Sequence, residues 1–171
     1  MSFWRSAFFD DVGLHGMRSW KSALFSLAVS SSVLAFPTGQ PLVLEVFLRQ
    51  AALSAFLLAA LILFCFAAAK LLGSQATVEW FFKTVAAVSA LGLSIAFVLG
   101  WSFIQLGQVL SNEVLIKAAF SVLPFYSFAL FGWGVEKAAH LQDYRGFLMA
   151  VLAITVFVLL HFFLEGIVVG I

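Results

Sequence analysis

Four long uncharged runs limit what this chain can fold into. They cover residues 50–69, 84–112, 118–135 and 146–164, with 20, 29, 18 and 19 residues. A helix of about 20 apolar residues crosses a hydrocarbon core of roughly 30 Å. Because lipid offers no hydrogen-bond partners, a spanning backbone must pair its own polar groups, as a helix does. Each run therefore predicts a transmembrane helix.

The composition agrees with this class of protein. Of the 171 residues, 64% are hydrophobic and only 10% are charged, whereas a soluble domain carries about 25% charged residues. Too little polar surface is present to cover a water-facing globule. The net charge is only +1 and the basic residues are few and scattered, so nucleic acid is not an expected partner. The expected environment is the lipid bilayer.

A fifth crossing is predicted less directly, at residues 22–36. This run has 15 residues, five of them serines, and reaches only about 22 Å. It crosses the membrane if Arg18 and Lys21 anchor its near end; otherwise it lies in the interface or dips in and returns. With five crossings, seven basic residues face one side and two the other, whereas four crossings give five and four. Cytoplasmic loops carry an excess of Lys and Arg, which favours five crossings with the N-terminus inside and the C-terminus outside.

The predicted fold is therefore all-α, an integral membrane bundle of five transmembrane helices, multi-pass in the inner (cytoplasmic) membrane of the cell. Residues 1–20 are expected to form a short amphipathic helix on the cytoplasmic interface. In the turn after the second crossing, Thr77 or Ser74 is expected to cap the next helix. The bundle occupies residues 21–171, with helices expected at about 21–37, 48–71, 81–109, 115–136 and 145–169.

Two features inside the runs predict how the helices pack. Gly92, Ala96 and Gly100 lie four residues apart on one helix face, a small-residue ridge that lets another helix approach closely. Packing within the chain is the simpler interpretation, and a dimer contact is the alternative. Pro124 lies inside the fourth expected helix, where it should produce a kink. A kink of this kind also occurs at transport sites.

Polar residues near the ends of the runs are the candidates for function. His161 and Glu165 are four apart on one helix face, a spacing that suits a side-chain pair, a proton relay or a ligand pair. Two ligands make a poor metal site, and a structural ion pair or interface anchor is the simpler interpretation. Glu136, His140 and Arg145 belong to the last cytoplasmic turn, as a plain charged turn or as a docking site for a partner.

Sequence motifs for catalysis are absent. The chain has no Ser-His-Asp arrangement, HExxH motif, P-loop or Gly-rich dinucleotide fingerprint. Cys65 is the only cysteine, which excludes a CxxC pair, and it suits a small hydrophobic position. Only one histidine lies in an apolar run, so paired haem ligation is not expected. We expect no enzymatic activity, no metal and no cofactor.

Two segments carry a resemblance to a known family. The segment "AKLLGSQATVEWFFKTVAAVSALGL" resembles the connection between the second and third helices of Yip1-domain proteins. The segment "FGWGVEKAAHLQDYRGFLMAVLAI" is similar to their last cytoplasmic turn, where Glu136, His140 and Arg145 correspond to the acidic residue, the histidine and the basic start of the fifth helix. The compact form looks like the bacterial members. The resemblance implies five crossings and no catalysis.

The function expected from these features is that of a non-enzymatic, Yip1-like scaffold. Such a protein organises or binds other membrane proteins or lipids, or serves as an accessory subunit of a larger membrane complex. The expected partners are the lipid bilayer and other membrane protein subunits. The alternative is a small transporter or channel that uses the kink at Pro124 and the His161/Glu165 pair.

Overall fold

A computed structural model describes residues 19–35, 43–141 and 144–169, with the side chains of residues 115, 118–124, 157–158 and 160–169 left out of the description. Within these ranges the chain forms five α-helices and no strand, so the prediction of an all-α fold is confirmed. The amphipathic segment predicted at residues 1–20 lies almost wholly outside the described residues. The helices are α1 (Trp20–Ala35), α2 (Leu44–Leu71), α3 (Val78–Val109), α4 (Glu113–Ala139) and α5 (Arg145–Val169).

Two of these helices are long and apolar enough to cross a membrane by length and composition. They are α2, with 28 residues, and α3, with 32 residues. Helix α1 has 16 residues, and the apolar part of α5 that the structure describes with its side chains, Arg145–Val156, is also short. The described residues thus provide two candidate membrane-spanning helices, and the five-crossing bundle stays a prediction.

The helix ends follow from local hydrogen bonding. The Thr77 hydroxyl accepts a hydrogen bond from the Trp80 N–H at 3.2 Å and caps α3, which leaves the Ser74 hydroxyl for a different contact. The Asn112 side chain accepts from the Val114 N–H at 3.0 Å and caps α4. Helix α2 is followed by Gly73 with φ of 91°, a left-handed conformation that costs glycine little.

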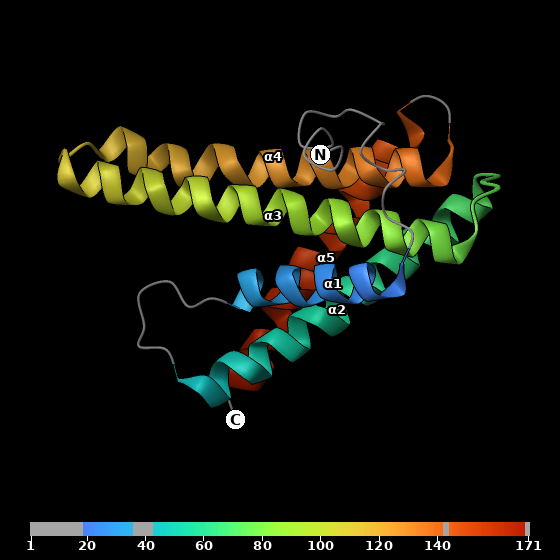
Figure 1. Ribbon diagram of the computed structural model, residues 1–171, viewed down its shortest axis with the longest axis horizontal. Coiled ribbons are helices and arrows are strands. Elements are labelled where there is room, and N and C mark those ends of the chain that lie inside the picture. Colours follow the sequence, from blue (N-terminus) through green and yellow to red (C-terminus); the bar gives the residue numbers. More distant parts are fainter. Residues whose placement is uncertain (1–18, 36–42, 142–143, 170–171) are drawn as a thin grey trace.

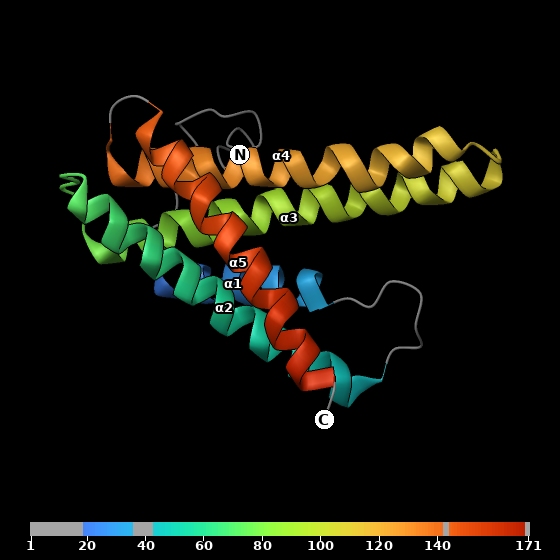
Figure 2. The same ribbon diagram turned by 180° about the vertical axis from the view of Figure 1, so that it is seen from behind.

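All five helices converge at one end of the molecule and diverge toward the other (Figure 1). The converging end, which we name the junction end, contains the start of α1, the α2–α3 turn and the α4–α5 connection. Helices α3 and α4 lie side by side as a long antiparallel pair, whereas α2 and α5 run diagonally away from it in both views (Figure 2). Helix α1 packs against both α2 and α3. The opposite end, with the α3–α4 turn and the start of α2, is named the spread end.

The apolar core lies toward the junction end. Residues of α2, α3, α4 and α5 form one buried cluster there, and the Phe66 and Phe81 rings meet edge to face with centroids 5.5 Å apart. A smaller cluster of Val88, Leu91 and Leu130 continues the contact between α3 and α4 toward the spread end. The buried members of the main cluster are Leu58, Leu61, Ile62, Cys65, Ala69, Phe81, Val85, Ala86, Phe131, Val135, Ala138, Ala139, Ala150, Ala153 and Ile154.

Glycines set the closest helix contacts. Gly92 packs against α4, where its carbonyl oxygen accepts a hydrogen bond from the Ser127 hydroxyl at 3.1 Å. A Cβ on Gly134 would lie 2.9 Å from Val88 Cγ1 of α3, and one on Gly146 would lie 2.7 Å from Glu136 Cα of α4. These distances are shorter than ordinary van der Waals contact, so only glycine fits at the two positions without a shift of the helices.

The other predicted packing residues lie in the same helices. Ala96 and Gly100 are partly buried on α3. The backbone of α4 is helical through residue 124, and the Pro124 side chain is among those outside the described set. Of the three residues of the predicted small-residue ridge, Gly92 is therefore the one whose packing against another helix, α4, the structure describes.

Replacing either interfacial glycine should weaken the bundle. Gly134→Ala and Gly146→Ala each force a methyl group against a neighbouring helix, and overpacking of this kind costs about 1–3 kcal/mol. Thermal unfolding of the purified protein in detergent should show a Tm several degrees lower for both variants. Ala60→Leu, on an exposed face of α2, is the control and should leave Tm within about one degree. An unchanged Tm for both glycine variants would contradict the close helix contacts.

Candidate functional site at the junction end

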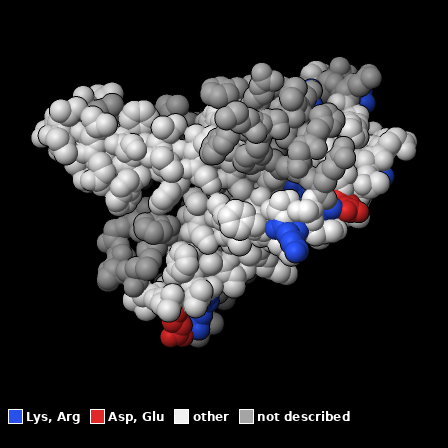
Figure 3. Space-filling view, viewed as in Figure 1, with Lys and Arg blue, Asp and Glu red and all other residues white. Residues whose placement is uncertain are grey.

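Charged side chains gather at the junction end. Of the seven Lys and Arg residues in the described ranges, five lie there and two lie at the spread end. In Figure 3 coloured atoms cluster over the right-hand side and at the lower tip, and the surface between them is white. The five at the junction end are Lys21, Lys70, Lys83, Lys137 and Arg145, and the two at the spread end are Arg49 and Lys117.

Lys83 is the most buried of these cations. Its residue is only 6% exposed, and its ammonium group pairs with the Glu79 carboxylate one turn earlier on α3. The same ammonium group lies 5.0 Å from the centroid of the Trp20 ring, a cation–π contact. The Trp20 ring also packs 6.0 Å from the Phe82 ring. Lys83 thereby connects the start of α1 to the start of α3.

Ser74 connects the α2–α3 turn to the end of α4. Its hydroxyl donates a hydrogen bond to the Ala139 carbonyl oxygen at 2.5 Å and accepts one from the Ala76 N–H at 3.2 Å. The Lys70 ammonium group donates to the Ser74 carbonyl oxygen at 3.2 Å. Ser74 is buried, and a buried hydroxyl is costly unless it is hydrogen-bonded. The Ala139 carbonyl belongs to the last turn of α4, which would otherwise leave it without an intrahelical partner.

The three residues predicted as a docking site all lie at the α4–α5 connection. His140 ends α4 in the left-handed conformation, with φ of 53°, and its ring stacks on the Trp80 ring with centroids 6.3 Å apart and planes 5° from parallel. Glu136 lies where α5 approaches α4 at Gly146. Arg145 is exposed at the first position of α5. They occupy one region, which also includes the contacts of Ser74 and Lys83.

The sequence pattern missed several residues of this region. Trp20, Ser74, Trp80 and Lys83 were not predicted as parts of one cluster, because they come from different helices and turns. The one available signal was the spacing of Glu79 and Lys83, four residues apart, which favours an ion pair on a helix. Spacing alone does not show whether such a pair is buried.

The other predicted polar pair lies elsewhere. His161 and Glu165 belong to the second half of α5, far along the helix from the junction end, and their side chains are outside the described set. Among the described residues no group of three or more His, Cys, Asp or Glu side chains is placed to hold a metal ion.

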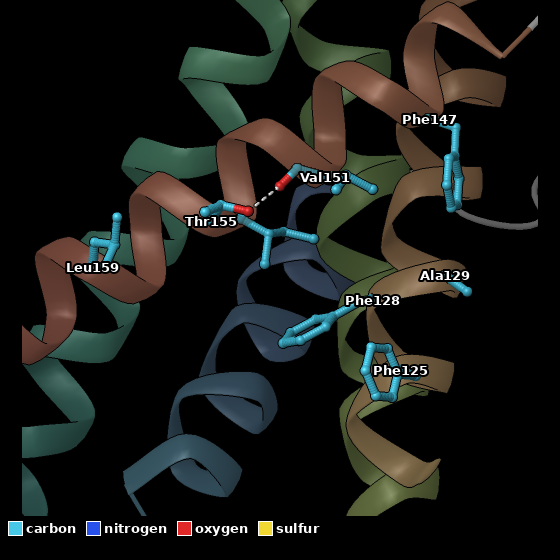
Figure 4. A pocket seen from close by; sticks show the side chains of 8 residues that line it. Phe125, Phe128, Ala129, Phe147, Val151, Thr155 and Leu159 are labelled. Atoms are coloured by element: carbon cyan, nitrogen blue, oxygen red, sulfur yellow. Dashed lines mark hydrogen bonds between the residues drawn. The ribbon is translucent and has the colours of Figure 1, made fainter. Parts of the chain in front are cut away.

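An apolar cleft separates α4 from α5 (Figure 4). Its volume is about 570 Å³, within the usual range of small-molecule pockets. Among the described residues, Thr155 is the only polar side chain that lines it, and its hydroxyl donates to the Val151 carbonyl oxygen at 2.9 Å. The lining residues in the described set are Phe125, Phe128, Ala129, Phe147, Val151, Ile154, Thr155 and Leu159.

Comparison with known proteins adds no relative to this description. No protein-family model, no curated protein sequence and no solved structure matches the chain. The resemblance to Yip1-domain proteins therefore stays a prediction from the two quoted segments.

Two ion pairs with the same spacing, one at each end of the molecule, allow a test of how much the contacts at the junction end stabilise the fold. Lys83–Glu79 and Lys117–Glu113 are both four apart on a helix, but the side chains of the second pair are 75% and 81% exposed. Lys83→Ala removes an ion pair whose lysine side chain is 7% exposed and whose Glu79 side chain is 56% exposed. It also removes a cation–π contact and the packing of the alkyl chain, and should lower the free energy of unfolding by about 1–2 kcal/mol. Lys117→Ala should change it by less than about 0.5 kcal/mol. Thermal or chemical unfolding in detergent measures both, and equal effects of the two variants would be the contrary result.

Proposed function

We propose that this chain is a non-enzymatic membrane protein with five crossings, of Yip1-like type, that binds and organises other membrane proteins or lipids. A chain of 171 residues could fill this role as an accessory subunit of a larger membrane complex. The N-terminus lies in the cytoplasm and the C-terminus on the far side of the inner membrane.

The observation that carries the proposal is the distribution of exposed apolar side chains. Every helix has large hydrophobic residues at its surface, with exposed fractions of 70% for Phe25 and Phe56 and 72% for Phe125. A water-soluble monomer rarely exposes contiguous apolar surface on this scale, whereas lipid tails solvate it without cost. Helix α2, with 28 residues, is about 42 Å long, close to the 40–45 Å of a bilayer with its headgroup regions.

The charges support the proposed orientation. The ends of α1, α2, α3, α4 and α5 alternate between the junction end and the spread end, as successive crossings require. Five of the seven described cations lie at the junction end, which the excess of Lys and Arg in cytoplasmic loops favours as the inner side. Lys21 lies one residue into α1, where it can reach the interface and extend the span of this short helix.

The junction end also provides the proposed docking surface for a partner. His140 and Tyr144 are exposed beside Arg145, and Tyr and Arg are enriched among the residues that dominate binding energy in protein interfaces. The stacked Trp80 ring and the Ser74 hydrogen bond hold the end of α4 at Ala139 and His140, and a pre-positioned His140 ring lowers the entropic cost of binding. The resemblance to Yip1-domain proteins points to the same kind of role.

Reporter fusions test the five crossings. A reporter inserted between residues 72 and 77 should be active only in the cytoplasm, and one fused after Ile171 only outside it, because in the proposed topology the α2–α3 turn faces inward and the fifth crossing ends on the far side. A fusion after Gln40 is the matched control and should report the outer side. Cytoplasmic activity of the reporter after Ile171 would overturn the five-crossing topology.

Purification from native membranes tests the binding role. The chain should recover at least one membrane protein reproducibly in mild detergent. Tyr144→Ala combined with His140→Asn should reduce this recovery about tenfold, since Asn retains the left-handed conformation of residue 140 while the ring is lost. Val114→Ala, which shortens an exposed side chain at the spread end, is the control and should leave recovery unchanged. A chain that purifies alone, with every variant equal, would contradict the proposal.

A further inference from the structure

The cleft between α4 and α5 has an apolar lining that suits a hydrocarbon chain. Aromatic and aliphatic side chains form its walls, and the Thr155 hydroxyl is already engaged by the Val151 carbonyl oxygen of its own helix. In Figure 4 the Phe125 and Phe128 rings come from α4, and Phe147, Val151, Thr155 and Leu159 follow α5. No described side chain offers a polar group that would hold a polar ligand inside the cleft. A saturated chain fits these walls better than a polar metabolite does.

The length of the cleft fits one acyl chain. Along α5 the lining residues extend from Phe147 to Leu159, about 18 Å at 1.5 Å per residue. This length is close to the roughly 15 Å of one leaflet of the hydrocarbon core.

One end of the cleft lies at the charged junction end. Phe147, which lines it, belongs with Arg145 to the first turn of α5. The Phe147 ring packs over Gly132 of α4, where a Cβ would lie 2.7 Å from the ring. Arg145 is exposed and has no ion-pair partner among the described side chains. Five cations and two acids, Glu79 and Glu136, lie at this end in the described ranges. The positive end of the α5 dipole also favours a negative group here.

We propose that this cleft binds one acyl chain of an anionic phospholipid from the leaflet at the junction end, with the phosphate of its headgroup at Arg145. The inference rests on the proposed membrane insertion and adds a specific lipid site to it. Bound in this way, the lipid fills the space between the two diverging helices and brings negative charge to the surface next to His140.

The test compares two lipids that differ only in the headgroup. The purified full-length protein is titrated in detergent with phosphatidylglycerol or phosphatidylcholine of the same acyl chains, and bound lipid is counted by native mass spectrometry. We expect one phosphatidylglycerol per chain to bind at least fivefold more tightly than phosphatidylcholine. Arg145→Gln should remove most of this preference, since a basic residue near a membrane surface contributes about a fivefold factor for anionic lipid.

Two neighbouring tryptophan variants separate the cleft from the rest of the apolar surface. Val151→Trp fills the cleft and should weaken binding of both lipids about tenfold or more. Leu152→Trp places the same ring on the adjacent position, which is 69% exposed and does not line the cleft, and should leave binding unchanged. Equal effects of the two variants, no headgroup preference, or a preference that Arg145→Gln retains would each overturn the inference.

Two further results distinguish this inference from the proposed function. If Val151→Trp abolishes recovery of a partner protein but leaves lipid binding intact, the cleft takes a partner's side chains and the lipid assignment is wrong. If the lipid results fail while the reporter fusions and the partner recovery hold, only the lipid site is lost. Cytoplasmic activity of the reporter after Ile171 would instead remove the membrane arrangement on which both depend.

Discussion

The hydrogen bond from the Ser74 hydroxyl to the Ala139 carbonyl oxygen fixes the end of the molecule from which all five helices diverge. It connects two segments 65 residues apart in the sequence, and it pairs a helix-terminal carbonyl that has no intrahelical partner. In an apolar surrounding, an unpaired carbonyl or hydroxyl costs several kcal/mol, so these two groups favour one arrangement of the α2–α3 turn against α4. The stack of Trp80 on His140 adds a contact between the start of α3 and the same end of α4.

The two sides of α4 show how glycine position determines where helices stay together and where they separate. Gly134 lies against Val88 of α3, and Gly132, two residues earlier and so on a nearly opposite face, lies under the Phe147 ring of α5. The contact of α4 with α3 continues through Gly92 and Leu130, which keeps these two helices side by side. On the other face large rings follow, Phe125 and Phe128. Both rings line the apolar cleft between α4 and α5.

The sequence predicted the elements of this fold better than their contacts. Uncharged runs predicted an all-α chain, because the absence of charge over a helix-length segment is a local property. Helix α2 begins at Leu44, before the expected residue 48, because Glu45 belongs to its first turn, and a boundary drawn from the uncharged run that starts at residue 50 does not reach it. Thr77 was one of two expected caps and is the one that caps α3, whereas Ser74 contacts a distant helix. The cleft depends on the angle between α4 and α5, which no local pattern contains.

The two ion pairs of equal spacing show why the junction end, and not the spread end, is the better candidate for function. Lys117 and Glu113 are both exposed at the spread end, so solvent screens their attraction and the pair contributes little to the stability of the fold. Lys83 is held under Trp20 with its carboxylate partner, so its position depends on α1 as well as α3. A ligand or partner that displaces α1 must also disturb Lys83. Binding that moves α1 is therefore coupled, through Lys83, to the packing of α1 on α3.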